Sequence, residues 1–181
     1  MIAANRYAQA ILDLAQQQNA TEVIYNNAQS LFKIIKSNKD LYNFFKSPLI
    51  KSDKKEKIIR QLFEKSTHSI LMQLISILCK RRREAIFPEI LQAIIQEYKR
   101  RNNIVTAQLV TAFKFDDELR KNLIEKIKNW KKTDKIELQE VIDESIIGGF
   151  ILKTENEQID SSIKTQLNHL YQSFLQTNSL N

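Results

Sequence analysis

Glycine is nearly missing from this chain of 181 residues, which contains only two glycines, adjacent at Gly148 and Gly149. Loops that bind phosphate groups need several glycines, because their backbone N–H groups must approach the anion closely. Neither the GxGxxG pattern of dinucleotide-binding folds nor a nucleotide-hydrolase phosphate loop can be written with this sequence. The chain is therefore predicted to hold no nucleotide by these routes.

Cysteine and histidine are also scarce. Cys79 is the only cysteine, which excludes an internal disulfide and a site made of several thiolates. It lies in an apolar segment, where the pKa of its thiol should rise and its reactivity fall. His68 and His169 have no second ligand at metal-binding spacing. We therefore predict a non-enzymatic protein with no catalytic residues, no cofactor and no metal.

Long apolar runs are absent too. The longest nearly unbroken run, Ile70 to Cys79, contains Gln73 and Ser76 and is about half of the roughly 20 residues needed to cross a bilayer. The first residues have no charged segment followed by a long apolar stretch, so they do not resemble a signal peptide. No direct membrane insertion is expected.

Positive charge, by contrast, is in excess, with a net charge of +7. This favours an acidic partner, and nucleic-acid binding is one alternative. The basic clusters Lys80 to Arg83 and Lys99 to Arg101 lie where helices are expected to end, and the helix dipole favours cations there. No aromatic residue is interleaved to stack bases, so the helix-end interpretation is preferred to a basic helical nucleic-acid-binding protein.

Apolar residues recur at helical spacing from Ala3 to about Asn102. Pro48 should end a short helix after Ser47, and Pro88 suits a first helical turn. Thr21 and either Ser52 or Asp53 are expected to cap helices. The spacing predicts a bundle of six helices, which begin near Ala3, Thr21, Asp40, Ser52, Ser69 and Phe87.

Two of these helices have more apolar surface than one contact requires. The first carries two neighbouring apolar stripes: Ala3, Tyr7, Ala10 and Leu14, and Ala4, Ala8, Ile11 and Ala15. The fifth has almost no polar face. Either both helices are internal, or a partner helix lies in a groove along them. Periodicity does not separate these possibilities.

The period changes after Asn103. Strands are expected from Ile104 to Ala112, around Ile136 and Leu138, and from Gly149 to Lys153, the last turning through Glu155 to Glu157. A helix from Asp116 to Lys132 separates the first two strands, and Asp160 should cap a final helix. The glycine pair lets a strand bend or another backbone approach. The fold class is thus mainly α: a helical bundle over 1–103, followed by a small α/β domain over 104–181.

Several segments match one known family in order. They are RYAQAI from Arg6, FFKSPLI from Phe44, Arg83 followed by IFPEI from Ile86, and, most specifically, IDESIIGGF from Ile142 and IDSSIKTQL from Ile159. Over nearly the whole chain they resemble the delta subunit of the rotary F-type ATP synthase, called the oligomycin-sensitivity-conferring protein in mitochondria. The chain departs from the family at Arg82, where glycine is frequent, and at Glu144, where proline is frequent.

The resemblance implies a stator subunit of a proton- or sodium-translocating synthase. The N-terminal bundle would bind the N-terminal helix of an α subunit of the catalytic head, and the C-terminal domain would bind the C-terminal region of the stalk b subunit. The complex would lie at the cytoplasmic face of the plasma membrane. The chain would hold the head still against the torque of the rotor.

The resemblance also implies where the α-subunit helix binds, namely between the first and fifth helices. The residues that it places there are Tyr7, Ala10, Ile11, Leu14, Leu74, Ile77 and Leu78. Structural roles are expected for Pro48, Pro88, Gly148, Gly149 and Asp160.

Overall fold

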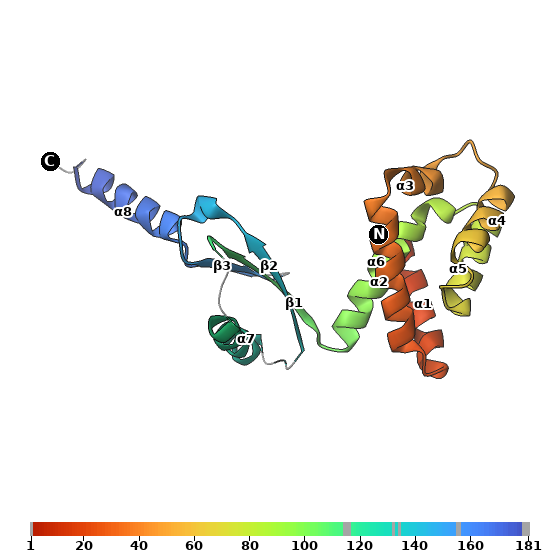
Figure 1. Ribbon diagram of the computed structural model, residues 1–181, viewed down its shortest axis with the longest axis horizontal. Helices are drawn as coiled ribbons and strands as arrows, with labels where there is room; N and C mark the ends of the chain where they lie inside the picture. The colour runs from red at the N-terminus through yellow and green to blue at the C-terminus, as the bar shows by residue number, and fades with distance from the viewer. Residues whose placement is uncertain (1, 114–116, 132, 134, 155–156, 179–181) are drawn as a thin grey trace. The chain divides into compact units, whose positions relative to one another are not determined.

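The helical periodicity of the first hundred residues is realised in the computed structural model, which describes residues 2–113, 117–131, 133, 135–154 and 157–178 (Figure 1). The chain divides into two units, residues 1–102 and 103–181. The first unit contains α1 (Ile2–Gln17), α2 (Thr21–Ser37), α3 (Lys39–Lys46), α4 (Ser52–Phe63), α5 (Ser69–Lys80), the short 3-10 helix η1 (Glu84–Ile86) and α6 (Phe87–Arg101). The prediction of a mainly helical protein with a small C-terminal sheet is confirmed.

The core of the first unit is aliphatic with an aromatic centre. Leu12, Ile24, Leu71 and Ile90 are fully buried, and each such side chain contributes roughly 1.5–3 kcal/mol relative to an exposed position. The rings of Phe45 and Phe87 stack with their centroids 5.4 Å apart. Tyr25 of α2 stacks on Tyr98 of α6 in the same way, at 4.1 Å. These ring contacts join α2 and α3 to α6.

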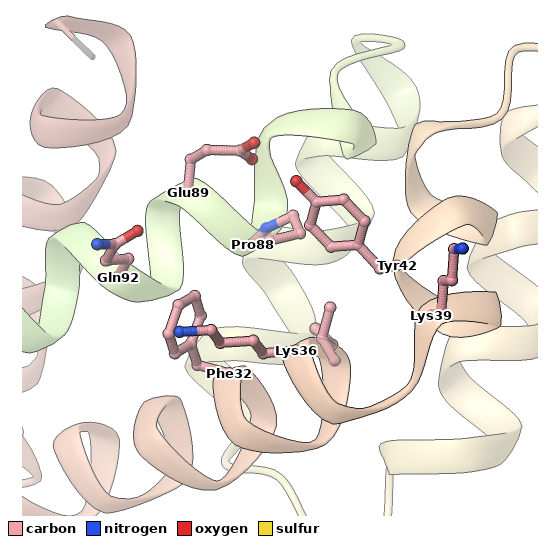
Figure 2. Close-up of a pocket in the computed structure, with 8 residues that line it drawn as sticks. Phe32, Lys36, Lys39, Tyr42, Pro88, Glu89 and Gln92 are labelled. Carbon is pink, nitrogen blue, oxygen red and sulfur yellow. The ribbon is translucent and has the colours of Figure 1, made fainter. Parts of the chain in front are cut away.

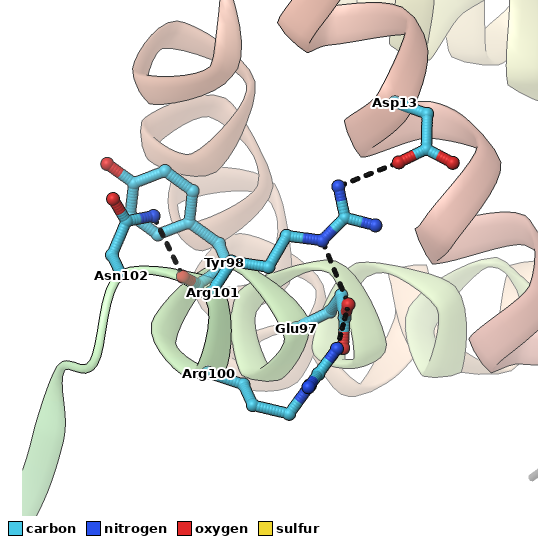
Figure 3. A network of polar contacts seen from close by, with 6 residues as sticks. All are labelled: Asp13, Glu97, Tyr98, Arg100, Arg101 and Asn102. Atoms are coloured by element: carbon cyan, nitrogen blue, oxygen red, sulfur yellow. Dashed lines mark hydrogen bonds and ion pairs between the residues drawn. The ribbon is translucent and has the colours of Figure 1, made fainter.

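A charged network closes the end of α6 (Figure 3). Glu97 accepts hydrogen bonds from Arg100 Nη2 at 2.7 Å and from Arg101 Nε at 2.9 Å. Arg101 Nη1 also donates to Asp13 of α1 at 2.7 Å. The hydrogen bonds from Arg100 and Arg101 lower the pKa of Glu97 to about 2. Within this basic cluster, Arg101 thus fixes α6 against α1, and Arg100 is paired with Glu97 of the same helix.

Two of the predicted helix caps are wrong. α2 begins at Thr21, but its N-cap is Ala20 and no side chain accepts a hydrogen bond there. The predicted caps Ser52 and Asp53 both lie inside α4, whose N-cap is Lys51 and has no side-chain hydrogen bond. The Ser52 hydroxyl donates to Glu84 at 3.2 Å. Asn38, which the sequence analysis did not single out, caps α3 by accepting from the backbone N–H groups of Asp40 and Leu41.

Both prolines lie where the sequence predicts. Ser47, the residue before Pro48, is extended and ends α3. Pro88 lies in the first turn of α6, where its missing N–H leaves no hydrogen bond unmade. Each proline therefore marks a helix boundary.

The second unit contains a four-stranded sheet with the strand order β2-β1-β3-β4. β1 (Val105–Thr111) runs parallel to β2 (Ile136–Ile142), and α7 (Asp117–Lys131) connects the two. β3 (Phe150–Lys153) lies antiparallel to β1 on its other side. β4 (Gln158–Asp160), a strand that the sequence analysis did not predict, pairs with β3. Asp116 and Lys132, as well as Glu155 and Asn156 of the predicted turn, lie outside the described residues.

The second unit has a small core. Ala107 and Leu109 of β1, Ile127 of α7 and Leu152 of β3 are buried together. The short 3-10 helix η2 (Glu144–Ile146) and the final helix α8 (Ile163–Asn178) complete the unit. Ser162 Oγ accepts from the Thr165 N–H and so caps α8, whereas the predicted cap, Asp160, accepts from the Ser162 N–H. Asp160 also accepts from the Thr165 hydroxyl at 2.9 Å, so it links the turn before α8 to the first turn of the helix without being its N-cap.

The glycine pair meets the steric demand expected of it. Gly149 has a φ of +74°, and a Cβ atom there would overlap the carbonyl oxygen of Ser161. A Cβ atom on Gly148 would come within 2.7 Å of Ile163 Cδ1. The segment before β3 can therefore approach the Ser161 backbone only because Gly149 has no side chain, whereas the end of the Ile163 side chain could move to admit a Cβ atom on Gly148.

Candidate partner-binding surfaces

The two apolar stripes of α1 have different environments. Ala4, Ala8, Ile11 and Ala15 are buried in the core. On the neighbouring stripe, Ala3 and Ala10 are exposed, and Tyr7 and Leu14 are partly buried. The sequence analysis could not decide whether both stripes are internal, and the structure leaves the second one accessible.

The accessible stripe leads into a hollow of about 340 Å³. Ala3, Tyr7 and Ala10 of α1 contribute its apolar lining, and Arg6, Arg81 and Arg83 surround it with guanidinium groups. Among the described residues, the guanidinium groups of these three arginines have no hydrogen-bonded or ion-pair partner. The hollow therefore combines a small apolar floor with uncompensated positive charge, which suits a segment with apolar and acidic side chains.

The turn that carries Arg81 and Arg83 is fixed by backbone hydrogen bonds. Arg83 N–H donates to Leu78 O at 2.8 Å, and Arg82 N–H donates to Cys79 O at 3.0 Å. These two bonds form a Schellman motif, which requires a left-handed residue after the helix. Arg82 occupies that position with a φ of +52°. Arg82 therefore occupies a position at which the motif usually has glycine.

A buried ion pair anchors the same turn. Lys55 of α4, whose side chain is only 2 % exposed, donates to Glu84 Oε1 at 2.9 Å and to Phe45 O at 3.0 Å. Burial alone would raise the pKa of Glu84, but the hydrogen bonds from Lys55 and Ser52 outweigh it and the pKa is lowered. Because Glu84 follows Arg83 directly, this pair helps to place the arginines. The sequence analysis missed it, since Lys55 is one of several lysines in a lysine-rich helix.

The residues proposed on α5 are not equivalent. Ile77 has 46 % of its surface exposed, but Leu74 and Leu78 have only 2 % and 0 % and belong to the core. Ile11 is likewise buried, with 9 % exposed. Tyr7 and Ala10 are brought together in the hollow, whereas Ile77 lies on the exposed face of α5. Leu74, Leu78 and Ile11 can thus support a partner only from beneath the surface.

The second unit has an accessible apolar face of its own on α8. Along this helix Ile163, Leu167, Leu170, Tyr171 and Phe174 are all exposed, with Phe174 at 67 %. α8 extends beyond the sheet (Figure 1). An exposed stripe of large apolar side chains is typical of a surface that a partner covers. The sequence analysis predicted this final helix but assigned it no partner on physical grounds.

Metal-ligating side chains are not grouped in the part of the chain that the structure describes. No group of three or more histidine, cysteine or acidic side chains is placed to hold a metal ion in that part of the chain. Burial raises the pKa of the Cys79 thiol to about 11, in the predicted direction. His68 accepts a hydrogen bond from the Ile70 N–H at the start of α5 and so has a helix-capping role. Within the described ranges, no helix is long and apolar enough to span a bilayer.

Comparison with known proteins gives a consistent result. The family model described as ATP synthase delta (OSCP) subunit matches residues 3–174. ATP synthase subunit delta of Prochlorococcus marinus (strain MIT 9301) is 32% identical over 164 residues, which cover 91% of each chain. The corresponding protein of Cytophaga hutchinsonii is 32% identical over 171 residues, which cover 94% of this chain and 93% of that one.

The fold is also found in a solved structure. A chain of the Toxoplasma gondii mitochondrial ATP synthase hexamer superposes with a TM-score of 0.74 over 95% of this chain and 97% of that one, at 20% identity. None of these matches is to a nucleic-acid-binding protein, so they lend no support to that alternative. The chain therefore belongs to the ATP synthase delta (OSCP) subunit family, whose members are non-catalytic subunits of the peripheral stalk of the F-type ATP synthase.

Proposed function

We propose that this chain joins the catalytic head to the stalk through two separate surfaces, one in each unit. Residues 1–103, acting as a bundle of six helices, bind the N-terminal helix of an α subunit. Residues 104–181 bind the C-terminal region of the b subunit. The complex lies at the cytoplasmic face of the plasma membrane, and the chain inserts no segment of its own into the bilayer.

The accessible stripe of α1 is the observation that carries the head contact. Ala3 and Ala10 are small, exposed and separated by about two helical turns, so a second helix can approach α1 closely along them. Tyr7 lies between them and is partly buried, which suits a ring that packs while its hydroxyl remains hydrated. Leu14 and Ile77 extend the apolar contact, and buried Ile11, Leu74 and Leu78 support it from below.

The arginines at the hollow add a requirement on the partner. Arg6, Arg81 and Arg83 surround the apolar floor without compensating acidic groups among the described residues. A partner helix that binds there should place carboxylate side chains or its negative C-terminal end beside them. The position of this negative charge along the partner helix would fix the direction in which that helix lies.

The apolar stripe of α8 supports the stalk contact. Leu167, Leu170 and Phe174 are spaced by three and four residues, and such spacing presents one helical face. A stalk made of helices can cover this face with an apolar stripe of its own. Burial of such side chains would contribute most of the binding energy.

The head contact is tested by titrating the full-length chain with the synthetic N-terminal peptide of the cognate α subunit in a calorimeter. We expect a micromolar or tighter complex, about −8 kcal/mol. Ala10→Asp should weaken binding by at least ~2 kcal/mol, because it places an unpaired charge against the partner's apolar side chains.

Gln9→Asp is the matched control, since it adds the same charge to an exposed position of α1 outside the stripe. This variant should bind like the unmodified chain. Equal affinity of the Ala10→Asp and Gln9→Asp chains would show that the partner lies on another face. Absence of any binding by the unmodified chain would contradict the head contact itself.

A further inference from the structure

A second and larger hollow lies elsewhere in the first unit, between α2, α3 and α6 (Figure 2). Its volume is about 590 Å³, and Phe32, Ile35, Tyr42 and Pro88 supply its apolar lining. It shares no lining residue with the hollow beside α1. A volume of this size is typical of binding sites, and the proposed contacts to head and stalk do not use it.

The charges at its rim do not cancel. Lys46 lies 3.4 Å from the Glu89 carboxylate and 4.5 Å from the centre of the Tyr42 ring, so Glu89 already has a cation beside it. Lys36 and Lys39 also line the hollow, and neither has an acidic partner among the described residues. The Lys36 ammonium group lies over the face of Phe32, 6.0 Å from the centre of the ring. Two positive charges therefore remain at the rim.

The position of Lys39 has no local explanation. Lys36 lies in the last turn of α2, where the helix dipole favours a cation. Lys39 is the first residue of α3, at the end of a helix where the dipole disfavours a cation. Figure 2 shows Lys39 and Lys36 on one side of the hollow, across from the α6 residues Pro88, Glu89 and Gln92.

The hollow is open rather than enclosed. Lys36, Lys39, Glu89 and Gln92 are all exposed, so solvent reaches it along the rim. A small metabolite in such a site would keep much of its surface in water, whereas a polypeptide segment can insert one or two side chains and cover the rest. The chemistry of the rim and the floor together therefore specifies a segment with apolar anchors and acidic neighbours.

We propose that this hollow docks an acidic amphipathic segment of another polypeptide, with its apolar side chains between Phe32, Tyr42 and Pro88 and its carboxylates at Lys36 and Lys39. The contact is a third one, in addition to those proposed for the head and the stalk. It depends on neither of them, because its residues are different.

The probe is a synthetic helical peptide of about 14 residues with a Leu and Phe stripe flanked by Glu. It is titrated into the isotope-labelled full-length chain, and the backbone amide signals are followed by NMR. Two comparison peptides carry Lys in place of Glu, or Ala in place of Leu and Phe. We expect only the acidic amphipathic peptide to shift the signals of Phe32, Tyr42 and Gln92, with weaker binding as salt is raised.

The variant Lys36→Gln/Lys39→Gln removes both free charges and should weaken the binding about tenfold. The matched control, Lys33→Gln/Lys54→Gln, removes two exposed lysines outside the hollow and should leave the affinity unchanged. Phe32→Ala, which removes part of the floor, should also weaken the binding. The Ala10→Asp chain should bind the acidic peptide as tightly as the unmodified chain, because Ala10 lies outside this hollow. This result would distinguish the hollow from the surface on α1.

The proposal is overturned if the shifts lie only on α1 and α5 or on α8, or if the basic peptide binds equally well. It is also overturned if the control pair weakens binding as much as Lys36→Gln/Lys39→Gln. Indole-3-acetate, a small aromatic carboxylate, is the last comparison. If this compound binds in the hollow as tightly as the acidic peptide does, the hollow is a site for small anions rather than a docking site for a polypeptide.

Discussion

Among the described residues, three α-helices are followed by a left-handed residue, and none of the three residues is glycine. Asn19 follows α1, Arg82 follows α5 and Asn103 follows α6, with φ values of 53°, 52° and 52°. Asparagine tolerates this conformation, but an arginine there has its Cβ close to a carbonyl oxygen, at a cost of roughly 1–2 kcal/mol. The near absence of glycine thus has a structural consequence at the end of α5.

Replacing Arg82 with glycine should stabilise the chain. Glycine relieves the contact of the Cβ atom, and its greater freedom in the unfolded chain offsets part of the gain, which leaves about 0.5–1 kcal/mol. Urea unfolding of the full-length chain measures the difference. Arg81→Gly, at the preceding position with a φ of −92°, is the control and should destabilise. A less stable Arg82→Gly chain would contradict the strain at this residue.

Glu97 should contribute stability that depends on pH. Its pKa in the folded chain is about 2, below the ordinary 4.5, because Arg100 and Arg101 donate hydrogen bonds to its carboxylate. A lowered pKa in the folded chain stabilises it above pH 4.5, and this stabilisation is lost as the pH falls towards 2. Glu97→Gln should therefore destabilise the chain by about 1–2 kcal/mol near neutral pH.

The check is urea unfolding of both chains over a series of pH values. The difference between them should shrink as the solution is acidified below pH 4.5. A difference that stays constant down to low pH would show that the carboxylate charge is not responsible.

Some residues could be assigned from sequence because their surroundings are local. Ser47 precedes Pro48, and Cys79 lies in an apolar segment, so the extended backbone of one and the raised pKa of the other follow from neighbours in the chain. Ser52 could not be assigned in this way. Its hydroxyl donates to Glu84, which is 32 residues away, and no local pattern reports that contact.

At the scale of helices, one buried ion pair holds three elements together. Lys55 of α4 joins Glu84 of η1 to Phe45 O of α3. Lys55→Met should destabilise the chain by about 3 kcal/mol, because it leaves the Glu84 carboxylate buried without a cation. Lys55→Met/Glu84→Gln should lose less, since no charge then remains buried. Thermal or urea unfolding distinguishes them, and a Lys55→Met chain as stable as the original would refute this role for the pair.

Helices could be predicted from sequence more completely than their environments. The two stripes of α1 are visible in the order of residues, but only packing decides that Ala4 and Ala8 face the core while Ala3 and Ala10 remain accessible. The apolar character of α5 likewise does not separate exposed Ile77 from buried Leu74. The strand β4 was missed because it is short and its pairing with β3 is its main support.

At the scale of the whole chain, the mainly helical class and the small sheet follow from the change in apolar period near residue 103. The hollow between α2, α3 and α6 does not follow from the sequence, because its lining joins Phe32 and Tyr42 to Pro88 from distant parts of the chain. The accessible surfaces on α1 and α8 belong to different units. Two independent contacts from one chain are the physical requirement for a protein that holds a head to a stalk.

Sedimentation velocity of the full-length chain, mixed with the catalytic head and a soluble fragment of the b subunit, tests this requirement most directly. The unmodified chain should form one complex that contains all three components. Ala10→Asp should release the head and keep the stalk fragment, and Leu170→Asp, on the exposed face of α8, should do the reverse. Loss of both partners by either variant, or of neither partner by both, would contradict a chain that binds head and stalk through separate surfaces.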